Sequence, residues 1–155
     1  RKTTPGFRVL EKYAVACGGG WNHRMGLFDR VMIKDNHVAA LQAETPEAFQ
    51  SLVAKARKIY PDLGIEVEID HLDQIEPAIA GGADILLLDN MSPGKLEHAL
   101  EMINDRVLTE ASGGINFKSI QDYANLGLNF ISTGAIVHQA VWLDVALDWT
   151  PAVPQ

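Results

Sequence analysis

The sequence is poor in cysteine, with Cys17 as its only one. A single cysteine excludes an internal disulfide bond and a cysteine-rich metal site, and it favours a reducing compartment such as the cytoplasm. No apolar run approaches the roughly 20 residues of a membrane-spanning helix. A glycine fingerprint of the G-x-G-x-x-G type is also missing, which argues against a doubly wound sheet. We interpret Cys17 as a small apolar residue beside a glycine turn rather than as a catalytic nucleophile.

Positive charge is scarce and unevenly placed along the chain, whose formal net charge is −7. Residues 1–34 hold seven Lys and Arg against two acids, whereas residues 35–155 hold six against eighteen. Such segregation suggests that the two parts face each other, or that the basic part meets an anion. Because the remainder is acidic, nucleic acids and membrane surfaces are poor partners. A small, multiply charged anion is favoured instead.

Short β-rich runs recur along the chain, namely "RVMIKDN", "GIEVEID", "ADILLLD", "RVLTEASGG" and "NFISTGA". Helical patterns lie between them, with start signals at Thr45-Pro46, Ser92-Pro93 and Asn116. Strands that alternate with helices predict a parallel sheet covered by helices. The opening "RKTTPG" resembles the end of a strand followed by a turn. With that strand placed before Arg1, we predict about six βα units in a partly open, TIM-barrel-like fold.

Carboxylates occupy strand positions that should face the barrel interior. Glu66, Glu68 and Asp70 share one face of their strand because side chains alternate, and the opposite face is apolar. Since the apolar faces must meet the helices, the carboxylates point inward, as do Asp89 and Glu110. Buried carboxylates require a cation, a metal ion or a ligand hydroxyl nearby.

Two lysines can supply such cations. Lys34 shares a strand face with Met32, and Lys2 lies at the mouth of the expected first strand. Lys2, Lys34, Glu68 and Asp89 together predict a site at the carboxyl ends of the strands, where barrels of this kind perform their chemistry. The alternative is a set of structural ion pairs at a solvated sheet edge.

Two glycine turns follow the last two strands, Ser112-Gly113-Gly114 and Thr133-Gly134. Glycine lets backbone N–H groups approach an anion closely, and phosphate sites in barrels often use the last two βα loops. Ordinary turn chemistry explains either turn equally well when each is taken alone.

The motifs "RKTTPGFR", "EKYAVACGGGWNHRMGLFDRVMIKDNH", "EVEID", "DILLLDNMSP", "EASGGI" and "STGAIVH" resemble, in order and spacing, the quinolinate phosphoribosyltransferase family. Its members are also called nicotinate-nucleotide pyrophosphorylases (carboxylating). The resemblance implies the C-terminal, partly open α/β barrel of a two-domain enzyme, over residues 1–155. The family's N-terminal α/β sandwich domain has no counterpart in the sequence.

The resemblance also implies a reaction. Quinolinate and phosphoribosyl pyrophosphate react, with Mg²⁺, to give nicotinate mononucleotide, pyrophosphate and CO₂ in NAD biosynthesis. The family generally works as a homodimer or higher homo-oligomer whose active site the partner's N-terminal domain completes. We therefore expect residues 1–155 alone to be inactive or severely impaired.

Residue roles follow from the same resemblance. The positions that match those holding quinolinate's carboxylates are Arg1, His23, Arg24 and Lys34. Lys2 and Lys34 match the lysines near the pyrophosphate, and Glu68 and Asp89 match the acids that meet the ribose hydroxyls and the Mg²⁺-bound substrate. The positions that match the 5′-phosphate cradle are Ser112, Gly113, Gly114 and Gly134, with His138 close by and Asn90 as a weaker candidate beside Asp89.

Three alternatives remain open from the sequence. A relative on the same scaffold could use another acceptor, as in a molybdenum-transport-associated paralogue. The chain could also assemble or bind metabolites without catalysis, because a missing first strand leaves an unpaired sheet edge. A sugar-phosphate isomerase or lyase would use the glycine turns but leaves the basic positions unexplained.

Overall fold

A single parallel sheet organises the chain in its computed structural model, which describes residues 2–141 and 143–149. Its five strands, in the order β1-β2-β3-β4-β5, are β1 (Val31–Ile33), β2 (Ile65–Ile69), β3 (Ile85–Asp89), β4 (Leu108–Ser112) and β5 (Phe130–Ile131). All four strand pairs are parallel. The strand order never reverses, whereas a doubly wound sheet has a reversal point. The predicted α/β class with a parallel sheet is therefore confirmed.

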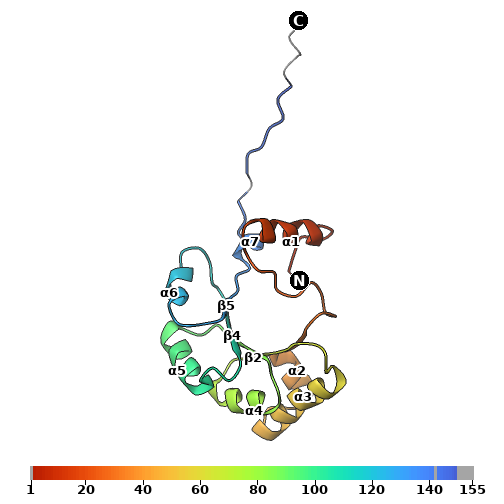
Figure 1. Cartoon of the computed structure of the whole chain (residues 1–155), viewed down its shortest axis with the longest axis vertical. Helices are drawn as coiled ribbons and strands as arrows, with labels where there is room; N and C mark the ends of the chain where they lie inside the picture. Colours follow the sequence, from red (N-terminus) through yellow and green to blue (C-terminus); the bar gives the residue numbers. More distant parts are fainter. Residues whose placement is uncertain (1, 142, 150–155) are drawn as a thin grey trace, which may run out of the picture.

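One helix precedes β1 and the others follow the strands in sequence, and the helices between β1 and β5 lie along the convex side of the curved sheet (Figure 1). They are α1 (Arg8–Cys17), α2 (Asp35–Ala40), α3 (Pro46–Ile59), α4 (Ile75–Ala80), α5 (Pro93–Ile103), α6 (Ile120–Ala124) and α7 (Ala135–His138), with a 3₁₀ turn at Leu72–Gln74. Helix α1 lies across the opening from the sheet (Figure 1). In the described part of the chain, no helix is both long and apolar enough to cross a membrane.

Local sequence signals explain where two of these helices begin. The Thr45 hydroxyl accepts a hydrogen bond from the Ala48 N–H at 3.3 Å, and the Ser92 hydroxyl accepts one from the Lys95 N–H at 3.4 Å. Each capping residue is followed by proline at the first helical position, where a missing N–H costs nothing. Both predicted helix starts are confirmed.

The predicted helix start at Asn116 is wrong by one turn. The Asn116 carboxamide oxygen accepts the Lys118 N–H at 2.9 Å, and α6 begins only at Ile120. An asparagine side chain that binds the backbone two residues ahead forms a turn of its own, which competes with the first helical turn.

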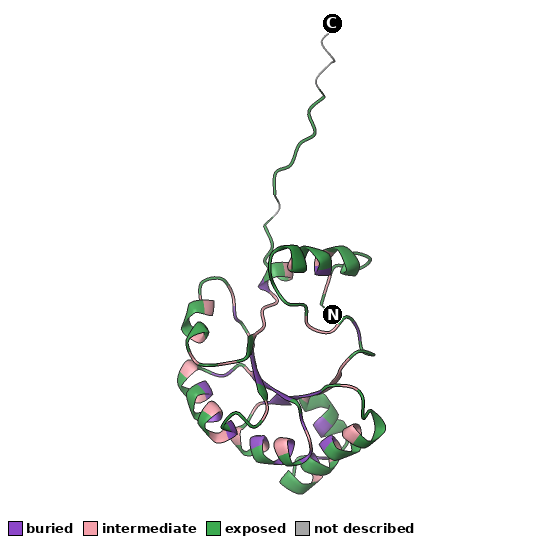
Figure 2. Ribbon diagram, viewed as in Figure 1, coloured by how far each residue is buried: buried purple, intermediate pink, exposed green. Residues whose placement is uncertain are grey.

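The hydrophobic core lies between the convex face of the sheet and the helices. Val67, Leu86 and Leu88 on the strands are fully buried there, together with Val53 of α3 and Leu96 of α5. Figure 2 shows buried residues along the sheet and on the inner sides of the helices. Glu66, Glu68 and Glu110 alternate with these core residues, so they lie on the opposite, concave face. The predicted division between an apolar helix-facing side and a charged interior is confirmed.

The predicted number of about six strands is not confirmed, because it included one strand placed before Arg1. The described residues contain five strands in a sheet that does not close. The expected additional strand was placed before Arg1, where this chain has no residues, and residues 2–7 form no strand.

Packing on the convex face predicts a large stability loss when it is disturbed. Leu88 is fully buried in β3, so Leu88→Ala should lower the free energy of unfolding by about 3 kcal/mol through lost apolar burial and a residual cavity. Urea denaturation of the chain would measure it. Leu41→Ala is the control, because Leu41 is 62% exposed and its loss should cost less than about 0.5 kcal/mol. Equal losses in both variants would contradict the assignment of the core.

Candidate functional site at the strand ends

The carboxyl ends of the strands bring predicted site residues together at one edge of the sheet. Lys34 directly follows β1, and its Nζ forms an ion pair with Glu68 Oε2 of β2. At the ends of β3 and β4, the Ser112 hydroxyl donates to Asp89 Oδ1 at 2.5 Å. Lys34, Glu68 and Asp89, three of the four residues predicted to converge, are thus neighbours, and Ser112 of the glycine turn lies beside Asp89.

Three carboxylates at this edge lie close enough to share a cation. One oxygen each of Glu68, Asp70 and Asp89 lie within 4.8 Å of one another. Carboxylate oxygens are the ligands that Mg²⁺ prefers, so this donor set fits the expected ion. Lys34 Nζ is the cation that neutralises Glu68 in the structure. Asp70 was absent from the predicted site residues, although its place on the Glu66–Glu68 face could have indicated it.

His37 positions the backbone of Lys34, a role that sequence reasoning missed. Its Nδ1 accepts a hydrogen bond from the Lys34 N–H at 3.0 Å, and the His37 N–H donates back to the Lys34 carbonyl at 2.8 Å. This reciprocal pair fixes the first turn of α2 and the direction in which Lys34 leaves the strand.

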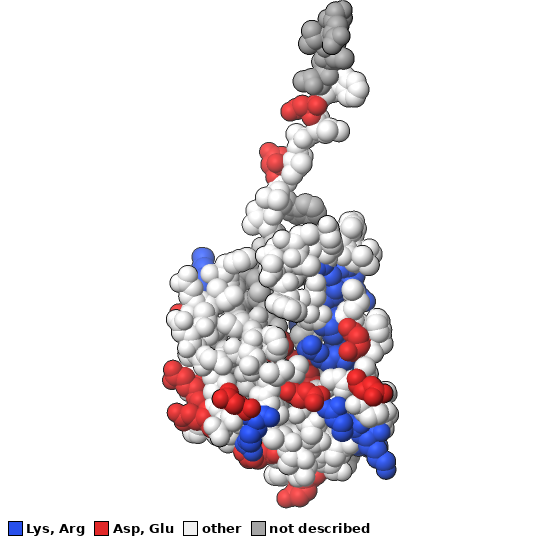
Figure 3. All heavy atoms as spheres, viewed as in Figure 1, with Lys and Arg blue, Asp and Glu red and all other residues white. Residues whose placement is uncertain are grey.

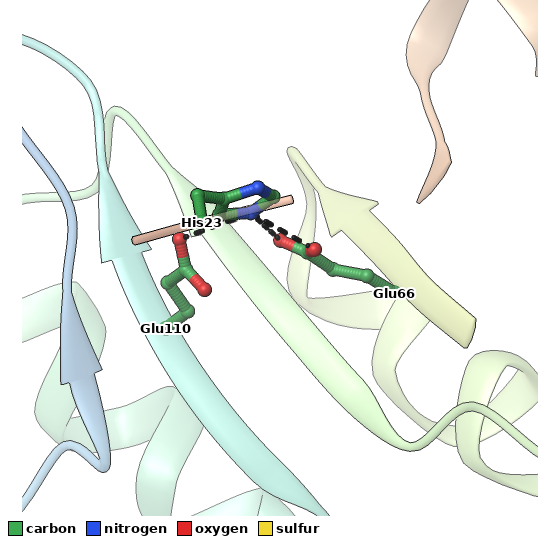
Figure 4. A group of neighbouring side chains, drawn as sticks. All are labelled: His23, Glu66 and Glu110. Carbon is green, nitrogen blue, oxygen red and sulfur yellow. Dashed lines mark hydrogen bonds and ion pairs between the residues drawn. The ribbon is translucent and has the colours of Figure 1, made fainter. Parts of the chain in front are cut away.

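A second cluster joins residues 23–30, which belong to the basic segment of residues 1–34, to the sheet (Figure 4). His23 Nε2 lies 3.1–3.2 Å from both Glu66 carboxylate oxygens and 3.6 Å from Glu110 Oε1. Arg30 Nη1 donates to Glu66 Oε2 at 3.1 Å. Glu66 belongs to β2 and Glu110 to β4, so His23 spans two strands.

The hydrogen bond at the other ring nitrogen of His23, Nδ1, determines its tautomer. Nδ1 accepts a hydrogen bond from the Arg24 N–H at 2.8 Å, so Nδ1 carries no proton. The proton of the neutral ring is therefore on Nε2, which donates toward the carboxylates. Although His23, Glu66 and Glu110 lie within metal-binding distance of one another, this tautomer leaves Nε2 without a lone pair for a metal ion.

The two carboxylates of this cluster are perturbed in opposite directions. Burial by itself would raise the pKa of Glu66, but the hydrogen bonds from His23 and Arg30 and the charge of Arg30 outweigh it and hold that pKa below its ordinary value. Burial raises the pKa of Glu110, and the nearby Glu66 charge adds to the increase, although the Ser132 hydroxyl opposes it. Glu66, which accepts hydrogen bonds from both His23 and Arg30, is therefore the glutamate of the two that keeps its charge.

A hollow of about 360 Å³ lies beside this cluster, and its lining includes Trp21, His23, Arg30, Glu110 and Ser132. On the face drawn in Figure 3, Lys and Arg side chains gather next to carboxylates around a hollowed surface. Sites for small molecules are typically concave and begin at about 300 Å³.

The other basic residues predicted for the site are Arg24, Lys2 and Arg1. Arg24 donates from Nη1 to the Arg30 carbonyl at 3.1 Å, which places it beside the start of β1. Lys2 is exposed and makes no ion pair with any described residue, so its predicted convergence on the site stays a prediction. Arg1 lies outside the described residues.

The two glycine turns lie side by side, because the Thr133 hydroxyl donates to the Ile115 carbonyl at 2.5 Å. At Gly113, where φ is +94°, a Cβ atom would lie 2.6 Å from the Asn90 backbone nitrogen, so only glycine fits. Asn90 itself donates to Asp89 Oδ2. At Gly134, a Cβ would lie 3.2 Å from the His138 ring.

Comparison with known proteins places these features in a family. The model for the quinolinate phosphoribosyl transferase C-terminal domain matches residues 1–148. The chain belongs to this family. It is 43% identical to the probable nicotinate-nucleotide pyrophosphorylase [carboxylating] of Bacillus subtilis, over 97% of the chain and 50% of that protein.

Solved structures agree with this membership. NadC from Streptococcus pyogenes superimposes with a TM-score of 0.82 at 42% identity, over 90% of this chain and 47% of that one. The nicotinate-nucleotide pyrophosphorylase from Francisella tularensis gives a TM-score of 0.79 at 44% identity, over 88% of this chain and 46% of that one. The chain thus spans about half the length of the curated relatives that it matches.

The Glu66 ion pairs of this quinolinate phosphoribosyltransferase-family chain predict a pH-dependent stability. The pKa of Glu66 is lower in the folded state than its ordinary value of 4.5. Ionised Glu66 therefore stabilises the fold fully above pH 4.5, and this stabilisation is lost as the pH falls through the folded-state pKa. Glu66→Gln should therefore cost about 2 kcal/mol at pH 7 and progressively less below pH 4.5. Urea denaturation across this pH range would measure the difference.

Glu110→Gln is the matched control, since the raised pKa of Glu110 reverses the sign. Ionised Glu110 opposes folding. The folded protein therefore loses stability as the pH rises from the ordinary pKa of 4.5 through the higher folded-state pKa of Glu110. The substitution should leave stability at pH 7 unchanged or higher. A loss at pH 7 as large as that of Glu66→Gln would contradict this division.

The His37 bond predicts a local effect on Lys34. His37→Ala removes the acceptor of the Lys34 N–H, so amide hydrogen exchange at Lys34 should accelerate about fivefold, which corresponds to about 1 kcal/mol for a lost cap. Exchange measured by NMR would show this. His98→Ala, an exposed position on α5, should leave Lys34 unchanged. Unaltered exchange in His37→Ala would contradict the positioning role.

Proposed function

We propose that this chain provides the phosphoribosyl-transfer site of a quinolinate phosphoribosyltransferase. The reaction joins quinolinate to the ribose of phosphoribosyl pyrophosphate and releases pyrophosphate and CO₂, giving nicotinate mononucleotide. The observation that carries the proposal is the convergence of Lys34, Glu68, Asp89 and Ser112 at one sheet edge, in a chain of this family.

The residues at this edge suit the charges of phosphoribosyl transfer. When the pyridine nitrogen attacks the anomeric carbon, positive charge builds on the ribose ring, and the carboxylates of Glu68 and Asp89 stabilise it. Lys34, with Lys2, neutralises the departing pyrophosphate. Glu68 and Asp89, beside Asp70, would hold substrate-bound Mg²⁺, which supplies further positive charge to the leaving group.

The basic segment suits a dicarboxylate. Arg1, His23, Arg24 and Lys34 are the positions that we assign to quinolinate, since arginine can bind a carboxylate through two parallel hydrogen bonds. A substrate carboxylate at His23 Nε2–H would replace Glu66 or Glu110 as the acceptor.

The glycine turns suit the 5′-phosphate. We assign this group to Ser112, Gly113, Gly114 and Gly134, with His138 adjacent. The support is that Gly113 admits no side chain and that the two turns are joined through Thr133 and Ile115.

The sheet is, in this proposal, one arc of a partly open, TIM-like barrel of about six strands. Its sequential strand order and the helices on one face support that reading. We further propose assembly as a homodimer or higher homo-oligomer, completed by a domain equivalent to the other half of the relatives. The single, exposed Cys17 is in keeping with a cytoplasmic location.

Calorimetric titration and turnover test the function. Quinolinate should bind this chain at least about tenfold more tightly than nicotinate, which lacks the second carboxylate. Joining the chain to the amino-terminal half of the Bacillus subtilis relative should raise turnover at least about 100-fold over the chain alone. In the joined protein, Lys34→Ala should lower kcat/KM by about 100-fold, the usual cost of one charge-stabilising group, and remain folded.

Each result has an outcome that opposes it. Equal affinity for the two acids would favour a family member with another acceptor. Binding without turnover in the joined protein would favour a non-catalytic binding protein. Full activity of Lys34→Ala would overturn the assignment of that lysine.

A further inference from the structure

The cluster of His23, Arg30, Glu66 and Glu110 holds one more acidic group than its cations can neutralise. His23 is neutral in the tautomer fixed by the Arg24 N–H, and Arg30 carries one positive charge. Arg30 pairs with Glu66, which is fully buried. If Glu110 were also ionised, the cluster would hold a net negative charge at a site only 3% exposed. A proton on Glu110 makes the whole group neutral.

Glu110 is the carboxyl group of this cluster that faces the hollow. Its side chain contributes to the hollow's lining, whereas Glu66 does not. The Ser132 hydroxyl donates to Glu110 Oε1, and His23 Nε2 lies 3.6 Å from the same oxygen. The proton therefore lies on Oε2, where no described residue competes for it. Glu66 is unsuited to give up a proton, because Arg30 and His23 keep it ionised.

The proposed reaction needs such a group. Loss of CO₂ from the N-ribosylated dicarboxylate breaks the bond between ring carbon C2 and its carboxylate, and the electron pair stays on C2 beside the positively charged ring nitrogen. That carbon must then take up one proton to give the product. Among the site residues assigned above, the lysines, arginines and histidines are assigned to anions, and Glu68 and Asp89 to the ribose and the substrate-bound Mg²⁺, so none is assigned to supply this proton.

We propose that Glu110 is the acid that protonates C2 after decarboxylation. This inference rests on the proposed function, because His23 then holds quinolinate at the wall of the hollow that Glu110 lines. The O–H bond of Glu110 breaks as the C2–H bond forms, and CO₂ leaves the hollow. The carboxylate that remains accepts hydrogen bonds from Ser132 and from His23 Nε2–H, and it regains a proton from water before the next turnover.

The two half-reactions allow a direct test in the joined protein described above. Glu110→Gln keeps the size of the side chain and an acceptor for Ser132, but it carries no acidic proton. General acids contribute about 100-fold or more to a rate. We expect the ratio of CO₂ to pyrophosphate released in a single turnover to fall at least tenfold, with the N-ribosylated dicarboxylate accumulating in mass spectra. Glu101→Gln, at an exposed position on α5, should keep the two products equal.

Different failures point to different proposals. If the Glu110→Gln variant releases CO₂ and pyrophosphate in equal amounts, and as fast as the joined protein without the substitution, the role of Glu110 is overturned and the proposed function stays intact. Absence of pyrophosphate release from the unsubstituted joined protein would overturn the proposed function and this inference with it. A Glu110→Gln variant that loses pyrophosphate release to the same extent as CO₂ release would also overturn it, since a proton donor acts only after the transfer.

A second measurement needs no turnover. Carbon-13 NMR of the glutamate carboxyl groups in residues 1–155 should show one signal, absent from Glu110→Gln, that titrates above the ordinary glutamate value of 4.5. The charge balance and the raised pKa of Glu110 both require this shift. A Glu110 signal that titrates at or below 4.5 would overturn the proposal.

Discussion

The buried ion pairs of Glu66 hold the basic segment of the chain against the sheet. Glu66 is fully buried in β2, and its two hydrogen-bond donors, the neutral His23 ring and the Arg30 guanidinium, come from residues 23–30, before the first strand. Removing a carboxylate from water is costly unless cations and hydrogen-bond donors replace the water. This requirement explains why an acidic protein gathers its bases in one short stretch: the concave face of the sheet carries the carboxylates, and the segment that covers it supplies the compensation.

Side-chain alternation along the strands determines where these charges can lie. Every second residue of β2, β3 and β4 packs against the helices, and those positions are apolar except for the buried Thr109, whose hydroxyl donates to Asn129 Oδ1. The intervening positions carry Glu66 and Glu68, then Asp89, then Glu110 and Ser112. Because all strands are parallel and in sequential order, their carboxyl ends meet at one edge, and the loops that follow begin there. The same register that builds the core therefore also places the charged groups of the site.

The sequence alone predicts the strand faces and the residues at the strand ends, but few of the side-chain contacts between distant segments. The strand faces, the helix starts at Thr45 and Ser92 and the Lys34–Glu68 neighbourhood follow from periodicity and from the parallel class. The partner of His23 does not, because Glu66 lies 43 residues away, beyond β1, α2 and α3, and residues 18–30 around His23 have no repeating pattern. The role of His37 depends on a hydrogen bond from ring to backbone, and the late start of α6 depends on which backbone group Asn116 binds. In both cases the same residues allow more than one local hydrogen-bond arrangement, so the sequence does not determine which one forms.

The different states of Glu66 and Glu110 follow from burial and from the hydrogen-bond donors that each receives, the His23 ring and the Arg30 guanidinium for Glu66 and the Ser132 hydroxyl for Glu110. Both carboxylates lie on the concave face, both are buried and both approach His23 Nε2. Arg30 extends from the residue before β1, and β1 pairs with β2, so its charge reaches Glu66 and stays farther from β4. Glu110 receives a serine hydroxyl instead, which stabilises charge far less than a guanidinium does. Two chemically identical groups thereby acquire separate tasks: one holds the loop that lines the hollow, and the other keeps a proton at the hollow's wall.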